Sequence, residues 1–553
     1  MKGVYVTQVK PEQDAVYDVI VVGGGINGSG IARDAALRGL TVLLLDKTDI
    51  AAGTTSWSSR LIHGGLRYLE HGEVPLVYES LRERERLIHI APHLVFPLAM
   101  TLPIYEHHKR GPFTIRAGMI AYDVLSYSKS LPRHQMFSRS GALAHEPGLN
   151  PDGLKAAARY YDAQIVFPER LAVENVLDAV AHGAVVRNRA RVNDLVLESG
   201  VVRGVRFVDE ATGDVDTARG RAVVNVAGPW VDEVLTSAGI SIPDRPLLGV
   251  TKGTHIVVES FPGAPDDAIY IEARSDGRPY FIIPWNGLYL IGTTDERYDD
   301  DLDMIVPSER EITYLLNETN LAIPDARLDR ECVRYAYAGL RPLPFQSNGA
   351  ESAITRRQII HNHAPRARGL LSVFGGKLTT YRNLAEQTVS KVGNLLGRDL
   401  RSSTTGEDRL PGARENLSQF STGFDRARPN WLSVQSAAYL VQVYGTRAAK
   451  VVDLATREEA LREVISPATG AIAATIVFSF SDEHASTLTD AMMRRSMIGY
   501  ATDAGFDALD GVARAARIGL GWDETRISRE LDEHLLYMKR FLPIAERKSG
   551  CAP

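Results

Sequence analysis

The sequence predicts an α/β protein that ends in an all-α domain. Its first 50 residues contain two aliphatic runs on either side of an alanine-rich stretch, which is the order of a strand, a helix and a second strand. Short β-branched runs alternate with glycine and aspartate turns between residues 155 and 260. Beyond residue 430 the pattern is that of amphipathic helices. At ~100–200 residues per domain, a chain of 553 residues is long enough for about three domains.

The first strand is expected at residues 17–22 (YDVIVV), because an uninterrupted apolar run is typical of a parallel strand buried on both faces. Gly23, Gly25 and Gly28 follow with the spacing GxGxxG and open a helix at 29–38. In this motif the first glycine allows a tight turn and the second lets the backbone approach a pyrophosphate. The third lets the helix pack closely on the strand. The sequence therefore predicts a Rossmann-type dinucleotide-binding domain.

The second strand, at 41–45, ends at Asp46, which lies 21 residues after Gly25. A carboxylate at this position is expected to hold unphosphorylated ribose hydroxyls, which favours NAD or FAD over NADP. Three features favour FAD. The motif is followed by one long chain rather than a compact six-stranded domain. Residues 374–377 (FGGK) open a second helix whose N-terminus can face the flavin pyrimidine, and residues 225–230 end a strand on glycine beside the expected cofactor.

The remaining α/β elements follow in chain order: a Ser/Thr/Gly-rich loop at 51–59, a charged helix at 76–90, strands at 192–197, 201–208, 222–226 and 370–374, and a helix at 379–396. Residues 280–294 are expected to form a hairpin, because Asn286-Gly287 is a preferred two-residue turn. Ser308 and Glu311 have the capping-box spacing and predict that a helix begins there.

Composition limits the possible functions. With 63 Lys and Arg against 68 Asp and Glu, the net charge of −5 argues against a nucleic-acid binder. The two isolated cysteines, Cys332 and Cys551, cannot form a zinc or iron–sulfur site, and no metal is predicted. No apolar run reaches the ~18–20 residues of a membrane span, and residues 1–10 lack the apolar core of a signal peptide. We therefore expect a cytoplasmic protein, either free or on a membrane surface.

Six segments, in the order of the chain, carry a family resemblance: 21–28 (VVGGGING), 58–69 (SSRLIHGGLRYL), 252–258 (KGTHIVV), 291–295 (IGTTD), 338–343 (AGLRPL) and 372–382 (SVFGGKLTTYR). They resemble the FAD-dependent glycerol-3-phosphate dehydrogenase family of respiratory, aerobic type. The helical tail, including residues 521–524 (GWDE), resembles the C-terminal domain of that family. Asp46 replaces the glutamate found in many members, which leaves ribose binding intact.

The resemblance implies a domain organisation. An FAD-binding domain like those of glutathione reductase and D-amino-acid oxidase is expected within residues 15–395. Its segments, about 15–90, 155–235 and 335–395, are interleaved with an antiparallel-sheet substrate domain from about 91–154 and 236–334. A linker at 396–415 and a helical C-terminal domain at 416–553 follow.

The resemblance also implies a reaction, the oxidation of glycerol 3-phosphate to dihydroxyacetone phosphate by hydride transfer from C2 to flavin N5. The near-dianionic phosphate requires fixed cations, and the family-like segments supply Arg67, His255, Arg341, Arg356 and Lys377. His255 is the candidate base, because histidine titrates near neutral pH. Arg341 is expected to hold the substrate and polarise the developing carbonyl. The other three are expected to contact the phosphate or the flavin.

The expected FAD contacts follow from the same segments, and His63 resembles the flavin-contacting histidine of the family. The full set is Gly23, Gly25, Gly28, Asp46, Lys47, Thr54, Thr55, Ser58, Ser59, His63, Gly64, Gly65, Val192, Gly228, Trp230, Gly375, Gly376, Lys377, Leu378 and Thr379.

The electron acceptor implied by the resemblance is a membrane quinone, since the chain has no second redox centre of its own. That requires a surface that meets lipid without crossing it, on the inner face of the cytoplasmic membrane. Residues 105–133 and 537–544 are the two candidate surfaces, because both mix basic and apolar side chains. A homodimer is an open expectation.

Three alternatives remain at this point. One is a glycerol-3-phosphate oxidase that uses oxygen. Another is an FAD-dependent amino-acid or 2-hydroxyacid oxidoreductase, although a carboxylate substrate needs fewer cations than a phosphate. The last is a flavin-binding module without catalysis.

Overall fold

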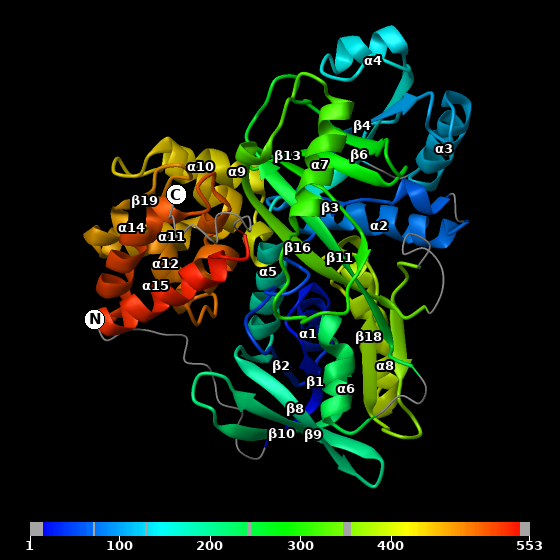
Figure 1. Cartoon of the computed structure of the whole chain (residues 1–553). Coiled ribbons are helices and arrows are strands. Elements are labelled where there is room, and N and C mark those ends of the chain that lie inside the picture. The colour runs from blue at the N-terminus through cyan, green and yellow to red at the C-terminus, as the bar shows by residue number, and fades with distance from the viewer. Residues whose placement is uncertain (1–14, 70–71, 128–129, 241–244, 347–354, 542–553) are drawn as a thin grey trace.

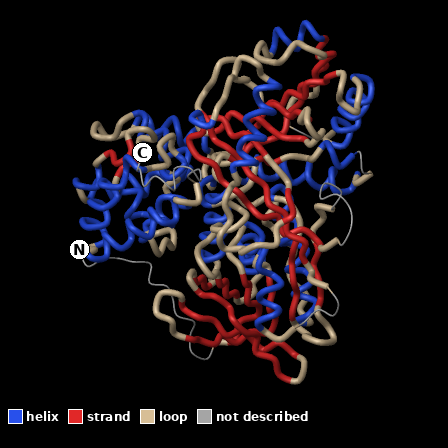
Figure 2. The backbone as a smooth tube through the Cα atoms, in the orientation of Figure 1, coloured by secondary structure: helices blue, strands red, loops and turns tan. Residues whose placement is uncertain are grey.

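The protein is described here by a computed structural model that covers residues 15–69, 72–127, 130–240, 245–346 and 355–541. Two large sheets form its α/β part, and the helices that follow residue 416 gather beside them (Figure 1). Figure 2 shows the same division, with the strands concentrated on one side and the C-terminal helices on the other. No helix among the described residues is both long and apolar enough to span a membrane.

The first sheet has a parallel centre with the order β18-β10-β1-β2-β7, and β17 pairs antiparallel at its edge. Its strands, with the β8–β9 hairpin that extends β10, are β1 (Val16–Val22), β2 (Val42–Leu45), β7 (Val185–Arg187), β8 (Ala190–Glu198), β9 (Val201–Asp209), β10 (Val215–Asn225), β17 (Ile359–Asn362) and β18 (Leu370–Phe374). The strands predicted at both ends of the glycine motif are confirmed. Their continuous apolar sequence is explained by packing on both faces of the sheet, against helices on one face and mainly against the β8–β9 hairpin on the other.

The carboxyl ends of the parallel strands carry the residues that the sequence singled out. Gly23 follows β1, Asp46 follows β2, Gly228 lies just beyond β10, and Gly375 follows β18. Because these strands are parallel, all four ends meet at one edge of the sheet, where doubly wound folds bind their ligands. Segments far apart in the sequence therefore converge on one site.

The second sheet is antiparallel except where β4 and β12 run parallel. Its strands are β3 (Leu61–Ile62), β4 (Val95–Tyr105), β5 (Gln135–Ser138), β6 (Leu154–Ile165), β11 (Leu248–Val258), β12 (Ala268–Glu272), β13 (Pro279–Trp285), β14 (Leu288–Gly292), β15 (Glu296–Arg297) and β16 (Val333–Pro344). The predicted hairpin is confirmed, because Trp285 pairs with Leu288 across Asn286-Gly287. Both turn residues have positive φ, as this tight turn requires.

Eight helices within the described residues accompany the two sheets: α1 (Ile26–Leu37), α2 (Val74–Ile90), α3 (Pro112–Leu125), α4 (Arg139–His145), α5 (Pro168–Ala181), α6 (Val231–Ser237), α7 (Glu309–Ala322) and α8 (Tyr381–Leu396). Helix α1 packs against α5 and α8. Gly30 makes the second contact possible, since a Cβ there would lie 2.8 Å from the ring of Tyr381. The predicted capping box of Ser308 and Glu311 is present at the start of α7.

The C-terminal domain is helical, apart from the two-stranded sheet of β19 (Val464–Ser466) and β20 (Ala471–Ile472). Its helices are α9 (Leu417–Arg426), α10 (Val434–Tyr444), α11 (Ala448–Arg457), α12 (Ala474–Ser481), α13 (Leu488–Asp490), α14 (Leu509–Ala515) and α15 (Glu524–Met538). Buried ion pairs join it to the α/β part. Arg170 on α5 reaches both carboxylate oxygens of Glu483, at 2.5 and 2.8 Å.

The segment expected to be a polar linker is packed against the α/β part. Leu410 and Ala413 are fully buried, and the Gly412 N–H donates to Glu174 on α5 at 3.0 Å. His93 Nε2 donates to the same carboxylate at 2.9 Å. The polar composition of this segment reflects hydrogen bonds to the α/β surface.

Candidate active site

A cavity of about 790 Å³ lies at the carboxyl edge of the parallel sheet. The residues along it come from the glycine loop, the loop after β2, the start of β8, the end of β10, β16 and the segment after β18. Of the expected FAD contacts, those that line it are Gly23, Gly25, Asp46, Lys47, Thr54, Thr55, Ser58, Val192, Gly228, Trp230, Gly375, Gly376, Lys377 and Leu378. The other six expected contacts are not among the residues that line it: Gly28, Ser59, His63, Gly64, Gly65 and Thr379.

The glycine loop leaves room for a diphosphate at the N-terminus of α1. A Cβ on Gly28 would lie 1.8 Å from the Gly23 carbonyl oxygen, so only glycine allows this approach of helix and strand. Gly23 has φ +114°, which other residues rarely adopt. The Thr55 hydroxyl accepts from the Ile26 N–H at 3.0 Å and fixes the neighbouring loop over the helix start.

The adenosine end of the cavity is lined by polar groups of Asp46, Lys47 and Trp230. The Asp46 carboxylate accepts from the Gly24 N–H at 2.6 Å and stands at the end of β2, where a ribose is expected. The Lys47 ammonium lies 4.0 Å from the centre of the Trp230 ring. Trp230 Nε1 is buried and has no hydrogen-bond partner among the described residues. A dinucleotide in this cavity therefore meets one donor, Trp230 Nε1, that is not already engaged.

The other end of the cavity begins at Gly375 and Gly376, with φ +72° and +82°. A Cβ on Gly375 would lie 2.6 Å from the carbonyl oxygen of Arg357. The Gly375 N–H donates to the carbonyl oxygen of Pro342 at 3.0 Å. This turn leads through residues 378–380 into α8. A helix start at this end suits the pyrimidine side of a flavin.

His255 lies on β11 in the second sheet and is buried. Its Nε2 lies 2.8 Å from the hydroxyl of Ser59, and its ring stacks on Tyr337 at 5.0 Å. Burial, with the positive charge of Arg341, lowers the pKa of His255 to about 3. The imidazole is therefore neutral at physiological pH and can accept a proton.

Arg341 on β16 is held by an acid and a threonine from the segment after β14. Its guanidinium donates to Asp295 at 3.0 Å and to the Thr293 hydroxyl at 2.9 Å. Arg356 reaches the other oxygen of Asp295 at 3.4 Å. Burial lowers the pKa of Arg341 to about 10, so the group stays charged. Gly253 on the paired strand leaves the space, because a Cβ there would lie 2.1 Å from Arg341 Nη2.

Lys377 lies at the flavin end of the cavity. Its ammonium is 3.9 Å from the centre of the Tyr68 ring and donates to the Ser80 hydroxyl at 3.1 Å. Burial lowers the pKa of Lys377 to about 7, even though Asp162 lies close enough to oppose the shift. His63 lies nearby, and burial with the charge of Lys377 lowers the pKa of His63 to about 4.

The structure thus brings Arg341 and Arg356 together on Asp295, and it places His255 close enough to feel the charge of Arg341 and Lys377 close enough to feel that of Arg356. Arg67 lies in the short helix Leu66–Leu69, and its side chain is outside the described residues.

Four residues at the site were not singled out from the sequence: Asp295, Thr293, Tyr337 and Tyr68. Asp295 and Thr293 stand in the family-like segment 291–295, so the resemblance contained them without indicating their role. Tyr68 likewise stands in the family-like segment 58–69, whereas Tyr337 is brought to His255 only by the pairing of β11 with β16 in the second sheet.

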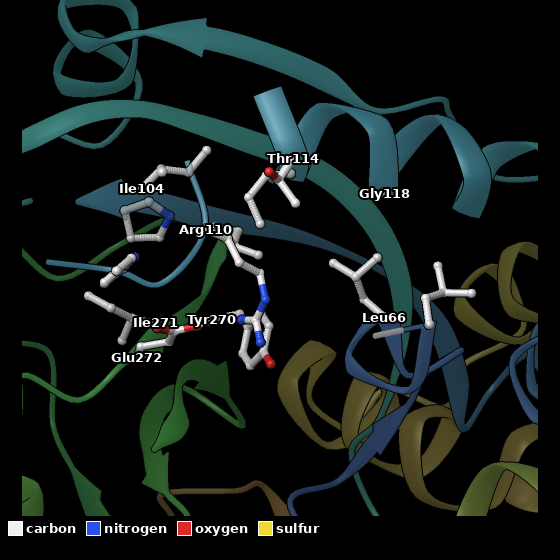
Figure 3. A pocket seen from close by; sticks show the side chains of 13 residues that line it. Leu66, Ile104, Arg110, Thr114, Gly118, Tyr270, Ile271 and Glu272 are labelled. Atoms are coloured by element: carbon white, nitrogen blue, oxygen red, sulfur yellow. Dashed lines mark hydrogen bonds and ion pairs between the residues drawn. The ribbon is translucent and has the colours of Figure 1, made fainter. Parts of the chain in front are cut away.

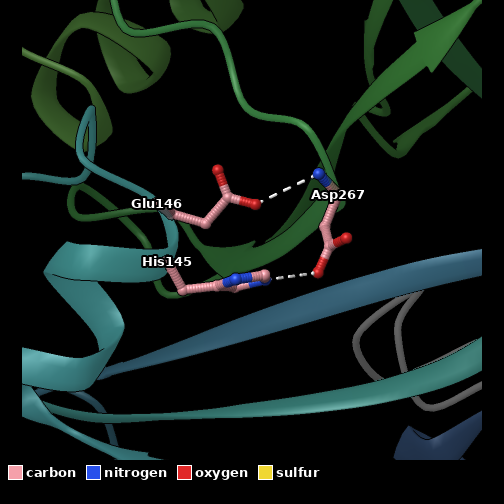
Figure 4. Close-up of side chains that lie close together, drawn as sticks. All are labelled: His145, Glu146 and Asp267. Atoms are coloured by element: carbon pink, nitrogen blue, oxygen red, sulfur yellow. Dashed lines mark hydrogen bonds and ion pairs between the residues drawn. The ribbon is translucent and has the colours of Figure 1, made fainter.

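His145, Glu146 and Asp267 form a cluster whose ligand-type atoms lie within 4.8 Å of one another (Figure 4). Arg159 already binds both oxygens of Asp267, at 2.6 and 2.9 Å. Glu146 accepts from the Asp267 N–H at 3.1 Å. The polar atoms of this cluster are hydrogen-bonded within the protein, and the absence of a metal stays a prediction.

Residues 18–382 match the family described as FAD dependent oxidoreductase. Residues 403–527 match the C-terminal domain of alpha-glycerophosphate oxidase. The chain is therefore an FAD-dependent oxidoreductase, which agrees with the glycine loop, the carboxylate at Asp46 and the size of the cavity.

Within that class the chain belongs to the glycerol-3-phosphate dehydrogenase family. It is 44% identical over 538 residues to the glycerol-3-phosphate dehydrogenase of Synechocystis, covering 96% of this chain and 97% of that one. It is 36% identical to the D-erythritol 1-phosphate dehydrogenase of Brucella abortus, over 80% of this chain and 87% of that protein. The glycerol-3-phosphate dehydrogenase of Bacillus halodurans, solved with FAD, superposes with a TM-score of 0.77 at 28% identity and 96% coverage of both chains. The predicted fold class, family and FAD cofactor are confirmed.

Proposed function

We propose that the protein oxidises sn-glycerol 3-phosphate to dihydroxyacetone phosphate and delivers the electrons to a membrane quinone. One observation carries the first half: a neutral buried histidine and three basic side chains, Arg341, Arg356 and Lys377, gather where the second sheet meets the flavin end of the cavity. When bound there, FAD supplies the hydride acceptor.

His255 is the residue we assign as base. Its Nε2 takes the proton of the substrate C2 hydroxyl, which replaces the Ser59 hydroxyl as hydrogen-bond partner. The low pKa of the free imidazole comes from burial and from the positive charge of Arg341. A substrate dianion beside Arg341 offsets that charge and raises the basicity of His255 when it is needed.

The basic side chains suit a phosphate better than a carboxylate. One bidentate arginine satisfies a carboxylate, but a near-dianionic phosphate favours several convergent cations. Arg341 and Arg356 share a single acid, Asp295, so the pair keeps a positive charge for an anionic substrate. This charge count is the reason to prefer glycerol 3-phosphate over amino and hydroxy acids.

An anaerobic titration tests the substrate. The yellow protein is mixed with glycerol 3-phosphate, and flavin absorbance is followed. We expect bleaching with glycerol 3-phosphate and none with glycerol, which lacks the phosphate. D-Erythritol 1-phosphate tests the substrate of the Brucella relative. A flavin that ignores glycerol 3-phosphate and responds to an amino or hydroxy acid contradicts the proposal.

A membrane-facing surface supports the quinone. On α3, apolar side chains recur on one exposed side: Phe113 is 86% exposed, Val124 67% and, just beyond the helix, Tyr127 89%. Exposed Arg116 and Lys109 accompany them. This combination suits a helix that lies on anionic lipid at the inner face of the cytoplasmic membrane.

The second candidate surface, 537–544, does not serve this role in its described part. Met538 and Phe541 are each 1% exposed, because they pack into the C-terminal domain and against Trp57. Residues 542–544 lie outside the described residues.

An apolar cavity of about 310 Å³ opens beside α3 (Figure 3). Leu66, Ile104 and Tyr270 line it, and Arg110 at its rim pairs with Glu272 at 2.7 Å. Leu66 begins the short helix that carries Tyr68, the residue stacked on Lys377. The cavity thus lies beside the expected lipid surface and shares a short helix with a side chain at the flavin end, and its largely apolar lining suits a quinone ring.

Gly118 allows a sharp test, since it lines this cavity and a Cβ there meets nothing within 4 Å. We expect Gly118→Phe to slow reoxidation of the reduced flavin by ubiquinone in vesicles and to leave reduction by glycerol 3-phosphate unchanged. Gly423→Phe on α9 is the matched control. Fast reoxidation by oxygen that exceeds the quinone rate contradicts the proposal and identifies an oxidase.

A further inference from the structure

The C-terminal helical domain reaches the FAD cavity. Arg494, Tyr537 and Arg540 line the same cavity as the glycine loop and Asp46. The α/β part therefore does not enclose this site alone.

A turn of π-helix, Ala491–Arg495, fixes the domain beside the adenosine end. It places two consecutive arginines on one carboxylate: Arg494 Nε donates to Asp49 at 2.5 Å, and Arg495 Nη2 donates to its other oxygen at 2.7 Å. These three side chains are buried. Asp49 lies in the loop that follows Asp46, so the ion pairs set the position of the C-terminal domain relative to the expected ribose site.

The residues just after α15 pack against the loop that adjoins the α1 N-terminus. Phe541 is buried, packs against Trp57 with ring centres 5.1 Å apart, and its carbonyl accepts from the Ala336 N–H at 3.0 Å. Trp57 belongs to the same loop as Thr55, whose hydroxyl accepts from the first N–H of α1. Arg540, which precedes Phe541, lines the cavity whose lining also includes Gly25 and Ile26 at the start of α1.

Arg540 brings a charge that the described residues do not neutralise. Its guanidinium lies 4.2 Å from the Tyr537 ring centre, which sets its orientation. Its Nε is buried without a hydrogen-bond partner, and no carboxylate in the described part of the chain pairs with it. Arg494 lines the same cavity but is engaged by Asp49 and Asp490. An arginine at a cavity wall without a carboxylate partner, as Arg540 is among the described residues, favours binding of an anion.

We propose that Arg540 binds the diphosphate of FAD, so that the C-terminal helical domain completes the cofactor site. The diphosphate carries the fixed negative charge of FAD, and the N-terminus of α1 offers it only backbone N–H groups. A guanidinium adds a full charge and two parallel donors. By linkage, bound FAD and the docked C-terminal domain stabilise each other.

The test measures FAD binding to the deflavinated full-length protein by quenching of flavin fluorescence. We expect Arg540→Gln to weaken FAD binding about tenfold, because the substitution removes at least one charge-assisted hydrogen bond. Arg540→Lys should recover part of the loss. Lys539→Gln, which removes the exposed neighbouring charge outside the cavity, should bind FAD as the wild type does. FAD affinity of Arg540→Gln within twofold of wild type overturns the proposal.

Competition by fragments identifies the group that Arg540 binds. ADP should compete less well for Arg540→Gln than for wild type, whereas adenosine should compete equally for both. An equal loss for ADP and adenosine overturns the assignment to the diphosphate. If Arg540→Gln does not fold, hydrogen exchange of the wild-type apoprotein decides the question. ADP, and not adenosine, should protect the backbone near Arg540, and equal protection by the two overturns the proposal.

Discussion

The hydroxyl of Ser59 lies 2.8 Å from Nε2 of His255, although the two residues are 196 positions apart. Ser59 precedes β3, in the stretch that leads on from the loop lining the FAD cavity, and His255 lies on β11, between β14 and β16 of the second sheet. The imidazole that we assign as base is thus placed by contact between the cofactor loop and the substrate sheet. A change on either side of this contact should alter catalysis.

Replacing His255 tests the base directly. We expect His255→Gln to slow flavin reduction by about 10²–10⁴-fold, the usual contribution of general base catalysis, and to keep the yellow spectrum. Stopped-flow absorbance under anaerobic conditions measures the rate. Ser59→Ala should cost far less, because it removes only a partner of the imidazole. A His255→Gln rate within a few-fold of wild type would exclude His255 as the base.

Arg341 should bind the substrate without being needed for FAD. Arg341→Ala is expected to keep the flavin spectrum and to lose substrate-driven reduction by about 10–100-fold, since charge-assisted hydrogen bonds contribute ~1.5–3 kcal/mol each. Arg310→Ala is the control, because that side chain is 78% exposed and pairs with Glu296 on the surface. Wild-type reduction by Arg341→Ala would remove this residue from the mechanism.

Titration of Lys377 should make the affinity for glycerol 3-phosphate depend on pH. Its pKa of about 7 means that the ammonium is charged below that pH and neutral above it. The substrate phosphate is a dianion above about pH 6. We therefore expect affinity for glycerol 3-phosphate, measured by flavin titration, to fall as the pH rises through 7. Lys377→Arg keeps its charge and should flatten this fall, and a profile unchanged in that variant would contradict the assignment.

The ion pair of Glu483 and Arg170, which links the C-terminal domain to the α/β part, should make stability depend on acid pH. Burial alone would raise the pKa of Glu483, but Arg170 and Arg447 outweigh it and lower the pKa to about 2. A carboxyl whose folded pKa is depressed stabilises the fold at pH values above its unfolded pKa, 4.5 here, and that contribution is lost between 4.5 and about 2. Glu483→Gln should destabilise the fold by ~3–5 kcal/mol, because it leaves two buried arginines short of a partner. Thermal unfolding at pH 7 measures this loss. An unchanged melting temperature would show that the pair is dispensable.

Substitution of Gly28 tests whether FAD binding requires the close approach of α1 to the glycine loop. Gly28→Ala puts a Cβ 1.8 Å from the Gly23 carbonyl oxygen, so we expect loss of bound FAD. Gly423→Ala on α9 meets nothing within 4 Å and should be neutral or stabilise the fold by up to ~1 kcal/mol. Flavin content of the purified variants measures the effect. Full FAD occupancy in Gly28→Ala would contradict the geometry of the loop.

Local features of the chain were predictable. The strand, glycine loop and second strand depend on residues within one βαβ unit, and they appear as expected. The hairpin at Asn286-Gly287 and the cap of Ser308 with Glu311 likewise depend on neighbours a few positions away. Backbone preferences and side-chain periodicity act between residues a few positions apart, so these features can be predicted from the sequence alone.

The side-chain pairings of the candidate site could not be predicted from the sequence, because they depend on the tertiary fold. Pairing of Asp295 with Arg341 and Arg356 joins residues 46 and 61 positions apart. Nothing in the sequence indicated that Arg540 would line the cavity of Gly23, because that contact depends on how a helical domain docks on an α/β domain.

The sequence by itself determined the family, the cofactor, the position of the dinucleotide loop and the types of charge at the substrate site. The tertiary structure alone decided which of those charges are neutralised, how far His255 and Lys377 shift their pKa values, and which domain closes the cavity. The physical reason is that charge and proton affinity depend on burial and on partners brought together across long stretches of chain, whereas strand, turn and cap preferences act between near neighbours.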